Sequence, residues 1–90
     1  MKRLEATVFG RVQGVSFRAF IQKEAQALSL KGFVRNLSNG AVEFVAEGEE
    51  KALSELLKKA RTGSPLANVD YIDATYAEPS KEFKSFSIKY

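Results

Sequence analysis

Nine consecutive residues, GRVQGVSFR from Gly10 to Arg18, combine residue types that can hold an anion. They follow a stretch of alternating apolar residues and lead into a helical pattern that carries Arg18 in its first turn. Glycines let a backbone turn sharply and approach a ligand closely, and the free N–H groups at the start of a helix attract negative charge. The segment therefore predicts an anion-binding loop.

A phosphoryl group in this loop would meet both main-chain and side-chain donors. The guanidinium of Arg18 offers a fixed fork of N–H groups that matches phosphate oxygens. Asn36 carries a donor and an acceptor, so it could hold a water in line for attack on phosphorus. Such a set suits a reaction that needs positioning and charge stabilisation but no strong base. The predicted phosphate-binding residues are Gln13, Gly14, Val15, Ser16, Phe17 and Arg18, and the predicted catalytic residues are Arg18 and Asn36.

The residue types that the chain lacks narrow the range of possible substrates. It contains neither His nor Cys, which removes the commonest general base, the thiol nucleophile and the commonest metal ligands. Expelling an alkoxide from phosphate requires a general acid or a metal ion. A carboxylate leaves without protonation, and a phosphate oxygen can accept the proton of the attacking water. An acyl phosphate, hydrolysed without metal or cofactor, fits this inventory best.

Length and charge set the broad class. A chain of 90 residues supports one hydrophobic core, and we expect a single domain over residues 1–90. The net charge is +3, but seven basic and two acidic residues up to Asn36 give +5, whereas seven basic and nine acidic residues after it give −2. The excess positive charge thus lies in the part that carries the loop. With no targeting or membrane segment in the pattern, we expect a soluble cytoplasmic protein.

The apolar periodicity predicts seven elements that would position these residues. Alternation predicts a strand over 4–10, and three- and four-residue spacing predicts a helix from Phe17, with Ser16 as its cap and Gly32 just past its end. A short strand over 33–37 and a return strand over 42–47 flank Asn39-Gly40, a strong hairpin signal. A second helix follows Gly48 and stops at 63–65, and strands are expected over 69–78 and 86–90.

This order predicts a ferredoxin-like α+β fold, βαββαβ with a short extra C-terminal strand. We expect an antiparallel sheet with two helices on one face, in which the first and second strands run parallel to each other through a right-handed crossover. Parallel strands end at the same edge of a sheet. Asn36 and Ser38 are therefore expected to lie beside the loop of residues 10–18.

The paired segments carry a family resemblance. GRVQGVSFR, followed by GFVRNLSNG over 32–40, resembles the two signature segments of the acylphosphatase family, and the similarity extends over nearly the whole chain. The resemblance implies a small single-domain acylphosphatase with a ferredoxin-like fold, which hydrolyses carboxyl phosphates to carboxylate and phosphate without cofactor or metal. By motif position it makes Arg18 the phosphate-binding arginine and Asn36 the water-orienting asparagine.

Ser16 departs from the commonest form of the motif, because small microbial acylphosphatases most often have glycine there. A β-carbon at this position disfavours positive φ, and the hydroxyl is expected either to cap the helix or to contact phosphate. Arg11 and Arg35, by contrast, are interpreted as surface residues.

Two binding functions remain as alternatives to an enzyme. One is a non-catalytic module that binds phosphate or carbamoyl phosphate, which composition does not exclude. The other is an RNA-binding ferredoxin-like module, against which stand the lack of an aromatic-rich central strand and the acidic Glu43 and Glu47. We expect an acyl phosphate and phosphate as small-molecule partners, no nucleic-acid or membrane partner, and a monomer.

Overall fold

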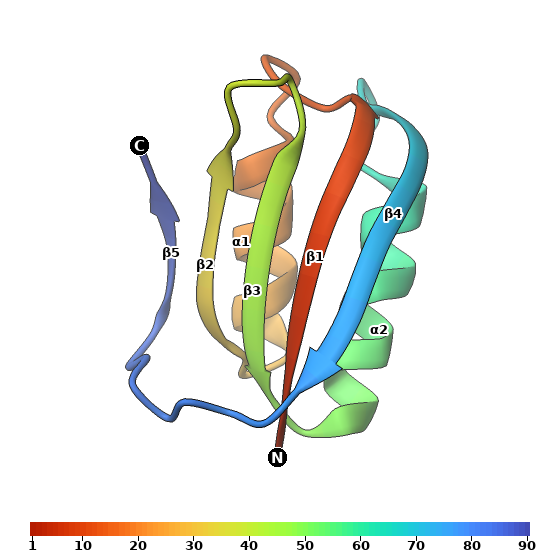
Figure 1. Cartoon of the computed structure of the whole chain (residues 1–90). Coiled ribbons are helices and arrows are strands. Elements are labelled where there is room, and N and C mark those ends of the chain that lie inside the picture. Colours follow the sequence, from red (N-terminus) through yellow and green to blue (C-terminus); the bar gives the residue numbers. More distant parts are fainter.

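The computed structural model describes residues 1–90 and contains the predicted order of strands and helices, shown in Figure 1. Every predicted element is present, with ends that differ by a few residues. The strands are β1 (Lys2–Arg11), β2 (Lys31–Asn36), β3 (Val42–Gly48), β4 (Asn68–Ala77) and β5 (Phe86–Lys89), and the helices are α1 (Phe17–Ala27) and α2 (Glu50–Thr62).

The five strands form one sheet in the order β4-β1-β3-β2-β5, with both helices on the same face (Figure 1). β1 pairs antiparallel with β3 and β4, and β2 pairs antiparallel with β3, which makes β1 and β2 parallel to each other. The predicted ferredoxin-like fold is confirmed. The antiparallel expectation holds for β1 to β4 only, because β5 pairs parallel with β2 and the whole sheet is mixed.

β5 runs parallel to β2 because of the route by which the chain reaches it. After β4 the chain crosses the ends of β1 and β3 to the opposite edge of the sheet, as Figure 1 shows. It arrives at the end where β2 begins, so a strand that continues along β2 must run in the same direction.

The core lies between the sheet and the helices, and the predicted periodicity accounts for it. The apolar stripe of α1 buries Phe17, Ile21 and Ala25, and the stripe of α2 buries Leu53, Leu56 and Ala60. Residues at three- and four-residue spacing share one helix face, and alternate residues share one sheet face. The strand residues that meet these helices are Leu4, Ala6, Val8, Val34, Val42, Phe44, Ala46 and Phe86.

The ends of the two helices show one correct and one wrong prediction. Gly63 caps α2 with a φ of 76°, as expected for a glycine that stops a helix. The expectation that Gly32 ends α1 is wrong, because Ser29 takes the left-handed conformation there, with a φ of 59°. Gly32 lies in β2 instead, where a β-carbon would overlap the carbonyl of Val45 on the neighbouring strand. Close backbone approach, and not helix capping, requires this glycine.

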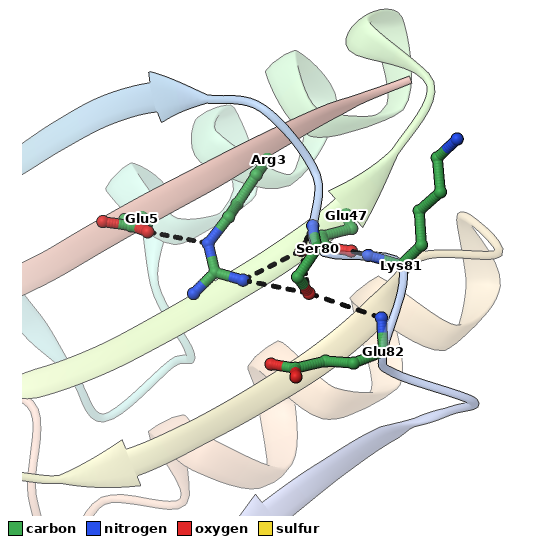
Figure 2. A network of polar contacts seen from close by, with 6 residues as sticks. All are labelled: Arg3, Glu5, Glu47, Ser80, Lys81 and Glu82. Atoms are coloured by element: carbon green, nitrogen blue, oxygen red, sulfur yellow. Dashed lines mark hydrogen bonds and ion pairs between the residues drawn. The ribbon is translucent and has the colours of Figure 1, made fainter.

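A buried carboxylate holds the connection between β4 and β5 against the sheet. Figure 2 shows Glu47, near the end of β3, facing Arg3 from β1 and the backbone of Ser80 and Lys81. Its carboxylate accepts hydrogen bonds from Arg3 Nη1 at 2.9 Å, Ser80 N at 2.8 Å, Ser80 Oγ at 2.9 Å and Lys81 N at 2.9 Å. Arg3 also pairs with Glu5 at 2.7 Å.

These donors keep Glu47 ionised although only 3% of it is exposed. Burial by itself raises the pKa of this carboxyl. The hydrogen bonds from the Ser80 backbone, the Arg3 guanidinium and the Lys81 backbone outweigh burial and lower the pKa from 4.5 to about 2. Glu47 is therefore a charged and fully satisfied anchor for the connection.

Candidate active site

The loop between β1 and α1 is held on both sides by contacts outside itself. Val12 and Val15 are buried in the core. The side-chain amide of Gln13 donates hydrogen bonds to the carbonyls of Leu37 at 2.7 Å and Ala41 at 2.9 Å, which ties the loop to the β2–β3 hairpin. From the other side, the hydroxyl of Ser64 donates to the carbonyl of Val15 at 3.1 Å. The loop conformation is thus determined by long-range contacts.

The hairpin that receives Gln13 forms where the Asn-Gly signal predicts it, but three residues separate the paired Leu37 and Ala41, and only Gly40 has a positive φ. The Leu37 amide donates to the Ala41 carbonyl at 2.8 Å, and the side chain of Asn39 accepts from the Ala41 amide at 3.0 Å. Asn39 thereby closes the turn with its own side chain, which is a common reason for its presence in turns. Asn39 and Gly40 are turn residues, as the sequence indicates.

Two residues of the loop have left-handed backbone conformations. Gly14 has a φ of 73° with open space where a β-carbon would lie, so conformation and not crowding favours glycine there. Ser16 has a φ of 63° and a ψ of 21°, and its side chain makes no capping hydrogen bond. The expectation that Ser16 caps α1 through its hydroxyl is therefore wrong. Side-chain capping needs an extended backbone at the cap residue, whereas Ser16 is left-handed.

One cavity of about 340 Å³ brings the predicted catalytic residues together. Arg18 reaches it from the first turn of α1, and Asn36 reaches it from the end of β2. The residues that line the cavity are Val12, Gly14, Ser16, Phe17, Arg18, Ala19, Asn36, Ile88 and Tyr90. The adjacency of Arg18 and Asn36, inferred from parallel strands, is present in the structure.

Some predicted residues do not line this cavity. Gln13 and Val15 hold the loop in place with their side chains, and only their backbone groups remain candidates for contact with a ligand. Ser38 lies on the exposed hairpin and is absent from the lining. Arg35 forms an ion pair with Glu43 at 2.7 Å, as expected for a surface arginine.

The C-terminal strand supplies a wall of the cavity that the sequence did not predict. Ile88 and Tyr90 line it, and Arg18 Nη1 donates to the carbonyl of Lys89 at 3.4 Å. The guanidinium carbon of Arg18 lies 5.0 Å from the centre of the Tyr90 ring, at cation–π distance. No local signal points to this wall, because it depends on the parallel pairing of β5 with β2.

No acidic side chain lines the cavity, and its polar side chains are those of Ser16, Arg18, Asn36 and Tyr90. No group of three or more His, Cys, Asp or Glu residues gathers anywhere in the structure. The side chain of Asn36 is exposed and makes no hydrogen bond within the chain. The cavity of this small α+β protein thus combines an arginine, an amide without a partner in the chain and a tight loop at the start of a helix, which are groups of the kind that can bind a phosphate-like anion.

Comparison with known proteins places the chain in a family. Residues 4–88 match the family model described as acylphosphatase. The chain is 50% identical over 76 residues to an acylphosphatase of Deinococcus radiodurans, covering 84% of this chain and 87% of the relative. It is 45% identical over 89 residues to an acylphosphatase of Caldivirga maquilingensis, covering 98% and 94%.

The solved structures agree with the sequence relatives. The crystal structure of acylphosphatase from Bacillus subtilis matches with a TM-score of 0.96 and 41% identity, over 100% of both chains. The chain belongs to the acylphosphatase family. It is a hydrolase of acyl phosphates, as the resemblance of its two motifs implies.

Proposed function

We propose that the cavity beside Arg18 and Asn36 is the active site, and that a water held by Asn36 attacks the phosphoryl group directly. The observation that carries this proposal is the shared cavity, which is lined by Arg18 from α1, Asn36 from β2, and Gly14 and Ser16 from the loop before α1. The backbone N–H groups from Gln13 to Phe17 and the guanidinium of Arg18 would hold the phosphoryl oxygens.

Arg18 suits this role because most of its donors are uncommitted. Only Nη1 contacts an acceptor in the chain, the Lys89 carbonyl at 3.4 Å, which is a long hydrogen bond. The planar fork can therefore present two parallel N–H groups to a phosphoryl group. The ring of Tyr90, which is fully exposed, lies at cation–π distance from the guanidinium at the cavity wall.

Asn36 suits the positioning of water because its amide has no partner in the chain. Its carbonyl oxygen can accept a hydrogen bond from the water and direct the water's lone pair at phosphorus. In the proposed step the water oxygen bonds to phosphorus, the bond from phosphorus to the acyl oxygen breaks, and the carboxylate leaves with the electron pair. The water's proton passes to an oxygen of the phosphate. No general base or acid is required, in keeping with a chain that lacks His and Cys.

The first experiment measures hydrolysis of benzoyl phosphate with a metal chelator present. We expect turnover well above spontaneous hydrolysis in the wild-type protein. Arg18→Ala should abolish both turnover and phosphate binding, because both depend on the same guanidinium. Asn36→Ala should slow turnover by roughly 10²- to 10³-fold while phosphate still binds, as is typical when one positioned polar group is lost.

A matched control separates these effects from general damage to the strand. Arg35 precedes Asn36 in β2, and alternation places its side chain on the opposite face of the sheet. Arg35→Ala should leave turnover unchanged within about twofold, as expected for an exposed ion pair. Equal loss of phosphate binding and turnover in Asn36→Ala would contradict the water-positioning role. Phosphate binding without turnover in the wild type would indicate the non-catalytic alternative.

The proposed setting of this activity is a single-domain cytoplasmic monomer with small-molecule partners. Neither helix has the length and apolarity that a membrane crossing requires. The open sheet face carries Glu43 and Asp73 beside its aromatic residues, and these carboxylates disfavour binding of a nucleic-acid backbone. Sedimentation of the purified protein and a titration with RNA would test the monomer and the absence of nucleic-acid binding.

A further inference from the structure

Ser16 occupies the anion-binding loop in a conformation that glycine adopts more readily. Its φ of 63° and ψ of 21° lie in the left-handed region, where the β-carbon of an L-residue is crowded against the backbone. Elsewhere in the loop, the left-handed position at residue 14 is a glycine. A side chain at position 16 therefore costs conformational free energy, and the fold gains nothing for that cost from a capping hydrogen bond.

The hydroxyl of Ser16 also has no structural role elsewhere. It takes part in no hydrogen bond within the chain, whereas two other serine hydroxyls hold loops in place. Ser64 donates to the Val15 carbonyl at 3.1 Å, and Ser80 donates to Glu47 at 2.9 Å. Ser16 is exposed and lines the same cavity as Arg18. Its hydroxyl has no acceptor within the chain, and the residue that carries it lines the proposed phosphoryl site.

We infer that the Ser16 hydroxyl is a substrate-binding group, which donates a hydrogen bond to a phosphoryl oxygen. The inference rests on the proposed function of this cavity. A phosphate dianion presents only acceptor oxygens, and the loop amides and Arg18 supply N–H donors from one end of α1. The hydroxyl adds an O–H donor that can rotate to suit the bound group. Its hydrogen bond to a charged oxygen is of the stronger kind.

Two substitutions at the same position separate the hydroxyl from the backbone conformation. Ser16→Ala keeps the β-carbon, and with it the backbone preference, but removes the donor. Ser16→Gly removes both the donor and the crowding of the left-handed conformation. If the hydroxyl binds phosphate, both variants should bind inorganic phosphate about 10-fold more weakly than the wild type, since a hydrogen bond to a charged group has been lost.

The measurement is calorimetric titration of the full chain with inorganic phosphate, together with the KM and kcat for benzoyl phosphate. Ser38→Ala is the matched control, because Ser38 is an exposed serine on the neighbouring hairpin that does not line the cavity. It should bind phosphate as the wild type does. Thermal unfolding of every variant checks that the fold is retained.

The results for the Ser16 variants distinguish failure of this inference from failure of the proposed active site. Wild-type affinity in Ser16→Ala would overturn the inference, even if Arg18→Ala loses binding and the active site stands. Tighter binding in Ser16→Gly than in the wild type would also overturn it, because the side chain would then hinder the ligand. Weaker binding in both variants, with an unchanged Ser38→Ala, supports a hydroxyl that contacts the phosphoryl group.

Discussion

Two arginines near opposite ends of the sheet have very different surroundings. Arg3, at the start of β1, donates to the buried carboxylate of Glu47 together with the backbone amides of Ser80 and Lys81 (Figure 2). Arg18, beyond the other end of β1, lines the cavity together with Gly14, Ser16 and Phe17. Around Glu47 a guanidinium and two backbone amides meet one carboxylate, and in the proposed site a guanidinium and loop amides would meet one phosphoryl group.

The backbone conformations of the two regions are alike as well. Lys81 has a φ of 61° and Ser16 has a φ of 63°, and neither residue is a glycine. Left-handed residues within a turn let successive N–H groups converge on one anion. At Glu47 the chain supplies that anion from β3, whereas at the cavity we propose that a phosphoryl group takes the place of the carboxylate.

Under the proposed function, the same donor chemistry would serve stability at Glu47 and ligand binding at the cavity. Each donor around Glu47 is used within the fold, so the interaction contributes to the free energy of unfolding. Arg18 and Ser16 use few of their donors within the fold, so their hydrogen-bonding capacity remains for a ligand. Removing an arginine should accordingly affect stability at one end of the sheet and activity at the other.

The largest expected effect comes from exchanging the two arginines for alanine in turn. Arg18→Ala should lower the activity by roughly 10³-fold or more while changing the free energy of unfolding by less than about 0.5 kcal/mol. Arg3→Ala should destabilise the protein by about 2 kcal/mol, because Glu47 stays buried without its guanidinium, and should leave kcat for benzoyl phosphate unchanged. Urea denaturation and the hydrolysis assay measure the two effects. A joint loss of stability and activity in either variant would break the comparison.

The next-largest effect is expected on acidification, which should protonate Glu47 and lower the free energy of unfolding. The pKa of Glu47 is lowered to about 2 in the folded chain, against 4.5 for the ordinary carboxyl. The stabilisation is thus fully present above pH 4.5 and is lost as pH falls toward 2. A shift of this size corresponds to about 3 kcal/mol.

The matched pair for this experiment is Glu47→Gln and Glu43→Gln, two carboxylates on β3. The difference in unfolding free energy between the wild type and Glu47→Gln should shrink as pH drops from 4.5 to 2. Glu43 makes only a partly exposed pair with Arg35, so Glu43→Gln should change stability by less than about 1 kcal/mol at neutral pH. If the difference in unfolding free energy between the wild type and Glu47→Gln stayed constant across this pH range, Glu47 would not be an ionised anchor.

Added phosphate should have the smallest effect on the free energy of unfolding, and it should act only through the cavity beside Arg18. At ten times its dissociation constant, phosphate should stabilise the wild type by about 1.4 kcal/mol. The same increment is expected in Glu47→Gln, whose cavity is intact, and no increment is expected in Arg18→Ala. Thermal unfolding with and without phosphate measures both. An increment that is lost in Glu47→Gln would show that the two regions are coupled.

Much of the fold follows from short-range patterns in the sequence. The stripes of α1 and α2, the alternation of the strands and the Asn39-Gly40 turn all depend on neighbours within a few residues. The adjacency of Arg18 and Asn36 needed one further step, the rule that strands joined by a helical crossover run parallel. These features could be predicted because local geometry and a general topological rule determine them.

Other features depend on contacts that no local pattern records. Glu47 meets Ser80 across 33 residues of sequence, and Gln13 meets Leu37 across 24. The wall made by Tyr90 requires the parallel pairing of β5 with β2. The expected side-chain cap at Ser16 does not form, because Val15 and Phe17 on either side of it are buried and Gln13 tethers the loop, and in this conformation Ser16 is left-handed.

The sequence by itself therefore determined the order of elements, the family and the two residues on which the proposed chemistry depends. Those conclusions rest on residue types and on spacing along the chain. Only the tertiary structure decided that β5 closes the cavity, that Glu47 anchors the connection leading to β5, and that the Ser16 hydroxyl is free. Each of these is set by the packing of segments far apart in sequence, where the free energy of the whole core outweighs local preference.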